Sequence, residues 1–131
     1  MSDTYLIGID VGTSGCKIIA VDGGKVIASA TVGYPLARPR VGWTEQNPVD
    51  WWNGVCEGLR KVCSGLEGRI AGISMSGQMH GLVALDEKME VVRPAILWND
   101  QRTELQCEEI TAAAGGLDGL LAVTISGFSA F

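Results

Sequence analysis

The sequence predicts a mixed α/β fold, and three observations support this. Two short apolar runs near the start, over 6–9 and 18–21, are joined by a Gly-rich turn at hairpin distance. An apolar face recurs at helical spacing over 48–64. Glycine supplies 18 of the 131 residues, about twice the usual share of ~7%, which indicates many tight turns between short strands. A mixed sheet with helices packed against it, within one domain, satisfies all three observations.

The sheet is expected to open with three strands joined by consecutive hairpins. The run over 6–9 is interpreted as a strand buried on both faces, and it ends at Asp10. The run over 18–21 forms the second strand, and the Asp-Gly-Gly-Lys segment at 22–25 is typical of a hairpin turn. Alternating apolar residues over 26–34 predict the third strand.

The first helix, over 48–64, has clear start signals. Asn47 suits the N-cap and Pro48 suits the first helical position. Trp51 and Trp52 could stack on a sugar, but their position at helical spacing just after a cap favours anchoring in the core.

The remaining chain is expected to alternate between short strands and one more helix. Apolar runs between polar turns define these elements. The segment over 117–126 is apolar but weakly patterned, so a short helix and a strand both stay open there. The expected elements are strands over 69–77, 82–85, 89–92 and 95–98, and a helix over 100–114 capped by Asn99 or Asp100.

Composition excludes several classes of partner. The net charge of −5 argues against a nucleic-acid or anionic-membrane surface, so any phosphate site is local. The sequence shows no basic-then-apolar leader and no long apolar run, which indicates a cytoplasmic protein without a membrane span. The four cysteines form no C-x-x-C pair and the chain has one histidine, so buried free thiols are expected rather than a zinc site.

The Gly-rich turn after the first strand has the residues of an anion site. A tight turn over 12–15 leaves backbone N–H groups unpaired, and Thr13, Ser14 and Lys17 add hydroxyl and ammonium donors. Asp10 beside a phosphate would repel it, so a partly hydrated Mg²⁺ between the two is the natural solution. The spacing is neither that of a Walker loop nor that of a G-x-G-x-x-G fingerprint. A plain hairpin with solvated charges is the alternative.

Two further polar segments follow predicted strands. SGQMHG, at 76–81, ends one strand between glycines, which is where open α/β sheets bind ligands. There, Gln78 and His80 offer hydrogen-bond donors and acceptors to a polyol, with a solvated or structural histidine as the alternative. In ILWNDQR, at 96–102, the local pattern alone indicates a helix cap followed by a surface charge.

Together, these segments resemble a known family. The D-x-G-T-S-x-x-K pattern at 10–17, with SGQMHG at 76–81 and ILWNDQR at 96–102 in that order, resembles the FGGY carbohydrate kinases, most closely their xylulokinase branch. The likeness begins near Tyr5, takes in the WTEQNP segment before the first helix, and reaches the GFSA segment at 127–130. It implies an actin-like, ribonuclease-H-like ATPase fold, with residues 1–131 as the N-terminal part of the first kinase domain.

The resemblance also implies an activity. This is the ATP-dependent phosphorylation of a sugar hydroxyl with Mg²⁺, most specifically of D-xylulose to D-xylulose 5-phosphate. ATP and a ketopentose or polyol are then the partners, and apolar surface left uncovered could drive formation of a homo-oligomer. The implied site residues are Asp10 for the metal, Gly12, Thr13, Ser14 and Lys17 for the phosphates, and Gln78, Met79, His80, Trp98, Asn99, Asp100 and Arg102 for the sugar.

In this family the catalytic base is an aspartate in a downstream D-x-A-G-type segment, which this sequence does not contain. The resemblance therefore implies no catalytic residue within these residues and no turnover by the chain alone. A non-catalytic sugar-binding or regulatory piece of the same fold is the alternative. A third class, an actin-like or acetate-kinase-like ATP-binding piece, would need no sugar, and SGQMHG argues against it.

Overall fold

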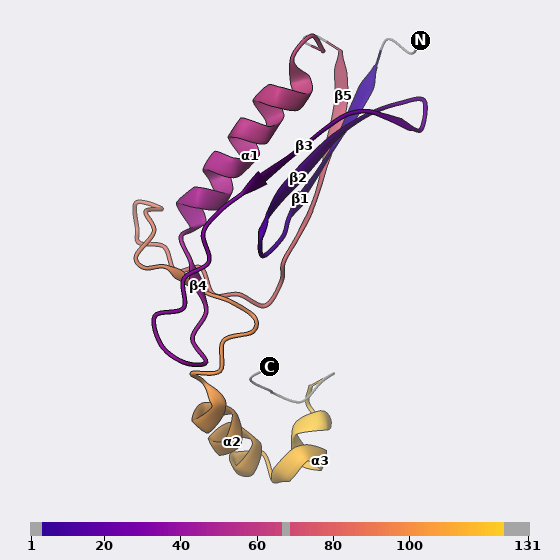
Figure 1. Cartoon of the computed structure of the whole chain (residues 1–131). Coiled ribbons are helices and arrows are strands. Elements are labelled where there is room, and N and C mark those ends of the chain that lie inside the picture. Colours follow the sequence, from indigo (N-terminus) through magenta and orange to yellow (C-terminus); the bar gives the residue numbers. More distant parts are fainter. Residues whose placement is uncertain (1–3, 67–68, 125–131) are drawn as a thin grey trace.

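Figure 1 shows the chain as a computed structural model, in which residues 4–66 and 69–124 are described. A sheet with helix α1 alongside it makes one part, and α2 with α3 makes a second part at the other end of the picture. The elements are β1 (Tyr5–Val11), β2 (Gly15–Asp22), β3 (Lys25–Gly33), β4 (Glu45–Gln46), α1 (Pro48–Cys63), β5 (Ile70–Gly77), β6 (Ala95–Ile96), α2 (Glu104–Ala113) and α3 (Gly116–Leu121).

The larger sheet has four strands in the order β3-β2-β1-β5. β1, β2 and β3 pair antiparallel, and β5 pairs with β1 in parallel, which confirms a mixed sheet that opens with three hairpin strands. Gly23 and Gly24 form the β2–β3 turn with φ of +54° and +83°, the left-handed values that a type I′ turn requires. The parallel pairing places Asp10 opposite Ser76, so two predicted site segments meet at one end of the sheet.

Helix α1 covers one face of the sheet (Figure 1) and forms the main core with it. Asn47 caps the helix as expected, because its side chain accepts a hydrogen bond from the Val49 N–H at 3.1 Å. Gly58 lets the helix approach β2 closely, since a Cβ there would lie 2.3 Å from Cδ1 of Ile18. The residues buried in this core are Ile7, Ile9, Cys16, Ile18, Ala20, Val55 and Val62.

The opposite face of the sheet is open. Leu6 on β1 is 56% exposed, and Ile73 and Met75 on β5 are 60% and 66% exposed. The expectation that the first strand is buried on both faces is therefore wrong for this chain. The physical reason is that α1 covers one face only, while α2 and α3 pack on each other away from the sheet (Figure 1).

The region before α2 is less regular than predicted. The strand pair expected over 82–85 and 89–92 is a loop with isolated bridges, one of which joins Leu82 to Ile96. The strand expected over 95–98 is reduced to β6, which pairs antiparallel with β4. Leu82, Val83 and Leu85 are 58%, 41% and 43% exposed, so the described residues provide little packing on this loop to favour a longer ladder.

The second helix begins later than predicted. The expected helix over 100–114 is wrong at its start, because α2 has Thr103 as its N-cap and no side-chain cap. Neither Asn99 nor Asp100 caps it. The Asp100 carboxylate instead accepts the backbone N–H of Thr44 at 2.6 Å, which is a partner far away in the sequence that local pattern could not indicate.

For the segment over 117–126 the sequence left both a helix and a strand open. Its first residues lie in helix α3, which begins directly after Gly115 with its left-handed φ of +87°. Residues 125 and 126 lie outside the described residues. The GFSA segment at 127–130 lies outside the described residues. Among the residues that are described, no helix is long and apolar enough to cross a membrane.

The two tryptophans of α1 have different environments. Trp51 is partly buried, and its indole N–H donates to the Gln46 side chain at 3.0 Å. Trp52 is 68% exposed, so the core anchoring expected of both residues is wrong for Trp52. Consecutive helical positions point in directions about 100° apart, and Trp52 lies on the side of α1 that faces away from the sheet.

The four cysteines carry free thiols, as the sequence predicted. Cys16 is fully buried in the core, and burial raises the pKa of its thiol, which keeps it protonated and unreactive. Cys56, Cys63 and Cys107 are only partly buried, so the expectation of buried thiols holds fully for Cys16 and only in part for these three.

Candidate phosphate and sugar site

The turn between β1 and β2 presents backbone donors. The Gly12 N–H donates to the Gly15 carbonyl at 3.0 Å, which closes the turn. In the described part of the chain, the N–H groups of Thr13 and Ser14 have no protein acceptor. Tyr34 donates its hydroxyl to the Gly12 carbonyl, and burial raises the pKa of this phenol to about 12, so it stays a donor. Two adjacent unpaired N–H groups can bind a phosphate oxygen.

Asp10 and Lys17 lie beside this turn on the open face of the sheet. They are opposite each other in the β1–β2 register, and both line a hollow of about 450 Å³ together with Ser76. The Ser76 hydroxyl donates to Oδ1 of Asp10 at 2.7 Å. Within the described residues, Lys17 forms no ion pair, which leaves its ammonium available to a phosphate.

The ligands beside the hollow suit a partly hydrated metal ion. No group of three or more metal-ligating side chains occurs among residues 4–66 and 69–124, so a dehydrated, fully protein-bound ion does not fit. Asp10 supplies one carboxylate beside the phosphate turn. One carboxylate, several waters and substrate phosphates are the ligands that Mg²⁺ prefers.

A closed ring of hydrogen bonds joins the turn to the loop after β5. Thr13 Oγ1 donates to Gln78 Oε1 at 3.1 Å, and Gln78 Nε2 donates to Gln46 Oε1 at 3.1 Å. Gln46 Nε2 then donates back to the Thr13 carbonyl at 2.7 Å. The Gln78 amide, a predicted sugar ligand, therefore uses both its oxygen and its nitrogen to hold the turn. The Thr13 hydroxyl proton points at Gln78, so any phosphate contact at this position falls to the backbone N–H.

The loop after β6 reaches the same turn. Nε1 of Trp98 lies 3.4 Å from Oγ1 of Thr13. The backbones of Leu82 and Ile96 exchange hydrogen bonds of 2.9 and 3.2 Å, and these hold the two loops side by side. The structure thus brings together three segments that are far apart in the sequence.

Met79 and His80 form the bend of the SGQMHG loop. Met79 is 70% exposed, and His80 is also exposed. His80 has a φ of +62°, a left-handed conformation that is uncommon for a residue with a side chain and costs on the order of 1 kcal/mol. Such backbone strain is frequent at ligand-binding positions.

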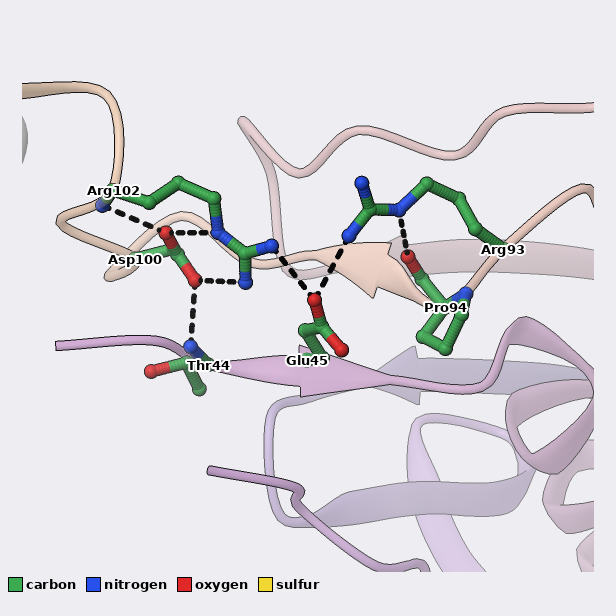
Figure 2. A network of polar contacts seen from close by, with 6 residues as sticks. All are labelled: Thr44, Glu45, Arg93, Pro94, Asp100 and Arg102. Carbon is green, nitrogen blue, oxygen red and sulfur yellow. Dashed lines mark hydrogen bonds and ion pairs between the residues drawn. The ribbon is translucent and has the colours of Figure 1, made fainter. Parts of the chain in front are cut away.

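Figure 2 shows the polar network that holds the loop after β6. Arg102 lies between two carboxylates, with its Nη2 2.6 Å from Oδ2 of Asp100 and its Nη1 2.7 Å from Oε1 of Glu45. Oδ2 of Asp100 also accepts the Thr44 N–H at 2.6 Å. Arg93 adds a further pair with Glu45 at 2.9 Å. The network therefore holds β4 against the loop that carries Trp98, Asn99 and Asp100.

Asp100 and Arg102 direct their polar atoms at protein partners. Burial acts to raise the pKa of Asp100, but hydrogen bonds from the Arg102 side chain and from the N–H groups of Thr44 and Arg102 outweigh it and lower the pKa to about 2. The Arg102 guanidinium also lies over the Trp43 ring, 3.8 Å from its centroid. Oδ1 of Asn99, by contrast, is buried without a hydrogen-bond partner in the described part of the chain.

Sequence reasoning missed Gln46, Tyr34 and Glu45 as supports of the site. Gln46 is 2% exposed, although glutamine is mostly a surface residue. The available signal was the likeness of WTEQNP to the same segment of the family, which indicated a shared segment but no role for its side chains.

Comparison with known proteins defines the class of this chain. Residues 5–128 match the N-terminal domain of the FGGY family of carbohydrate kinases, so the chain belongs to this family. Its match to solved sugar-kinase structures confirms the fold that the three motifs implied.

The similar proteins include several xylulose kinases. The chain is 48% identical over 124 residues to the xylulose kinase of Bacillus subtilis strain 168, which covers 92% of this chain and 24% of that protein. The crystal structure of xylulose kinase from Rhodospirillum rubrum matches with a TM-score of 0.79 and 30% identity, over 83% of this chain and 23% of that one. A gluconate kinase from Lactobacillus acidophilus matches with a TM-score of 0.73 and 35% identity, over 86% and 22%. The chain spans about a quarter of each relative's length.

Proposed function

We propose that this chain is the N-terminal part of the first domain of an ATP- and Mg²⁺-dependent sugar kinase that converts D-xylulose to D-xylulose 5-phosphate. The observation that carries the proposal is the hydrogen bond from the Thr13 hydroxyl to the Gln78 side chain at 3.1 Å. It joins a candidate phosphate site directly to a candidate sugar site, and phosphoryl transfer requires these two to be adjacent. Similarity to proteins named as xylulose kinases supports the choice of sugar.

The phosphate end of the site is assigned to the β1–β2 turn. The backbone N–H groups of Thr13 and Ser14, beside Gly12, bind phosphoryl oxygens, and the Lys17 ammonium adds positive charge. Asp10 holds Mg²⁺ through water. When bound there, the ion neutralises charge that develops on the phosphoryl group during transfer.

The sugar end is assigned to the loops after β5 and β6. Residues with an exposed side chain or an unpaired side-chain oxygen are proposed to contact the sugar directly: Met79, His80, Trp98 and Asn99. Residues whose polar atoms are bonded within the chain are proposed to support it indirectly: Gln78, Asp100 and Arg102. Apolar faces of a methionine and a tryptophan suit the carbon skeleton of a sugar, and the polar side chains suit its hydroxyls.

A chimaera tests this proposal. Residues 5–128 of this chain replace the matched quarter of the Bacillus subtilis xylulose kinase, which supplies the rest of both substrate sites. ADP release is then followed with D-xylulose and with gluconate. We expect D-xylulose-dependent release within about tenfold of the unaltered enzyme, in the range of roughly 1–100 s⁻¹.

The other outcomes of that experiment are equally informative. A folded chimaera that binds D-xylulose but releases no ADP would favour the non-catalytic alternative. Activity with gluconate alone would keep the kinase and correct the sugar.

A further inference from the structure

We propose that Gln46 is a positioning residue that couples two parts of the site. These are the β1–β2 turn over residues 12–15, called the phosphate turn, and the loop after β5 over residues 78–81, called the sugar loop. The proposal rests on the sugar-kinase function above and adds to it a residue that belongs to neither loop. Gln46 lies in β4, just before helix α1, and is 2% exposed. It therefore acts on the reaction through its neighbours and not by touching the substrates.

The side-chain amide of Gln46 makes every hydrogen bond that it can make. Its Nε2 donates to the carbonyls of Thr13 at 2.7 Å and Pro35 at 3.2 Å. Its Oε1 accepts from the indole N–H of Trp51 at 3.0 Å and from Nε2 of Gln78 at 3.1 Å. A primary amide has two N–H donors and two lone pairs on its oxygen, so all four are used.

These partners fix the direction of two amides. An indole N–H can only donate and a backbone carbonyl can only accept, so the Gln46 oxygen must face Trp51 and its nitrogen must face Thr13. The Gln78 nitrogen must then face Gln46, and the Gln78 oxygen must face the Thr13 hydroxyl. Rotation of either amide would leave buried donors or acceptors unpaired, which is costly.

The phosphate turn and the sugar loop therefore cannot shift independently. Gln46 holds the backbone of Thr13 on one side and the side chain of Gln78 on the other. Gln78 in turn donates its backbone N–H to the Val11 carbonyl at 2.8 Å. A misplacement of about 1 Å between reacting groups can lower a rate by ~100-fold, so a residue that sets this spacing should control kcat more than substrate affinity.

Gln46→Met in the chimaera is the first test, since methionine keeps the length of the side chain and removes all four hydrogen bonds. We expect kcat to fall about 10- to 100-fold, with the KM values for D-xylulose and ATP within about threefold of the parent. Gln106→Met makes the same chemical change at an exposed position of α2 and should leave kcat unchanged. An unaltered kcat in Gln46→Met, or a loss that comes from KM alone, would overturn the proposal.

A double-mutant cycle with Gln78→Met separates coupling from general damage. If both residues act through one ring, the double variant should lose little more kcat than either single variant. Losses that multiply would show that the two side chains act independently, which contradicts the proposal.

Amide hydrogen exchange in the isolated 131-residue chain tests the coupling without any activity. Gln46→Met should speed exchange at the Gly12 amide of the turn and at the Gln78 amide of the loop, both of which are hydrogen-bonded in the structure. Exchange at Ile18 in the core should stay unchanged. Unchanged exchange at Gly12 and Gln78 would overturn the coupling, whereas an inactive parent chimaera would count against the proposed function alone.

Discussion

Asp100→Asn should destabilise this chain, and the loss should depend on pH. The Asp100 side chain is 1% exposed, and its carboxylate accepts the Thr44 N–H at 2.6 Å. It also accepts the backbone N–H of Arg102 at 2.9 Å and two guanidinium N–H groups of Arg102 at 2.6 and 2.7 Å. Asparagine keeps one acceptor oxygen but turns an NH₂ group toward these donors. Arg102 also loses one of the two carboxylates between which it lies.

The size of the effect follows from the pKa of Asp100. Burial acts to raise this pKa, but the hydrogen bonds from Arg102 and Thr44 lower it from 3.8 to about 2. A difference of roughly two units between the unfolded and folded states corresponds to about 2–3 kcal/mol of folding free energy. Because the folded state has the lower pKa, this stabilisation is complete above the unfolded value of 3.8 and is lost as the pH falls from there through about 2.

Urea unfolding of the purified chain at two pH values measures this difference. At about pH 6 the free energy of unfolding of Asp100→Asn should lie about 2–3 kcal/mol below that of the parent, and the gap should narrow at about pH 2.5. Asp118→Asn, at an exposed position in the first turn of α3, is the matched control and should change stability by less than ~0.5 kcal/mol. A gap of equal size at both pH values would refute the reasoning, because the carboxylate charge would then contribute nothing.

Two further predictions concern the site. His80→Ala in the chimaera should lower kcat/KM for D-xylulose by about 10- to 100-fold, the effect of roughly 1–3 kcal/mol from an unpaired polar partner; an unchanged value would rule out the contact. The isolated 131-residue chain should release no ADP from ATP and D-xylulose, because His80 is assigned to the sugar and Asp100 is already bonded, which leaves the described sugar loops without a base for the hydroxyl. Sugar-dependent release at roughly 1–100 s⁻¹ would show that these residues already form a complete site.

The sequence predicted well those features that local chemistry decides. The β2–β3 turn follows from two adjacent glycines, and the start of α1 follows from Asn47 and Pro48, whose effects depend on their immediate neighbours. Family resemblance implied an actin-like topology, whereas the parallel pairing that sets Asp10 opposite Ser76 was found only in the structure. Local pattern alone reached only a mixed α/β fold.

The predictions that failed depended on partners that are distant in the sequence. Leu6 is an apolar residue in an apolar run, which favours burial. Its burial, however, requires a layer of side chains on the open face of the sheet that residues 4–66 and 69–124 do not provide. Asp100 has the local appearance of a helix cap, but it bonds to Thr44 instead. The role of Gln46 could not be predicted, because a glutamine beside a helix cap is ordinary in sequence. Its four hydrogen bonds form only once other segments of the chain fold around it.

The turn from Asp10 to Ser14 is the part of the molecule on which the proposed kinase chemistry depends most. Steady-state kinetics of Asp10→Asn in the chimaera test this dependence directly. The control is Asp22→Asn, which lies at the last residue of β2, away from the turn. We predict that Asp10→Asn lowers kcat by at least about 100-fold and leaves the KM for D-xylulose within a few-fold, because a metal at Asp10 acts on charge that develops only during transfer. Equal changes in kcat and KM, or an unchanged kcat, would contradict this assignment and leave Asp10 a structural residue bonded to Ser76.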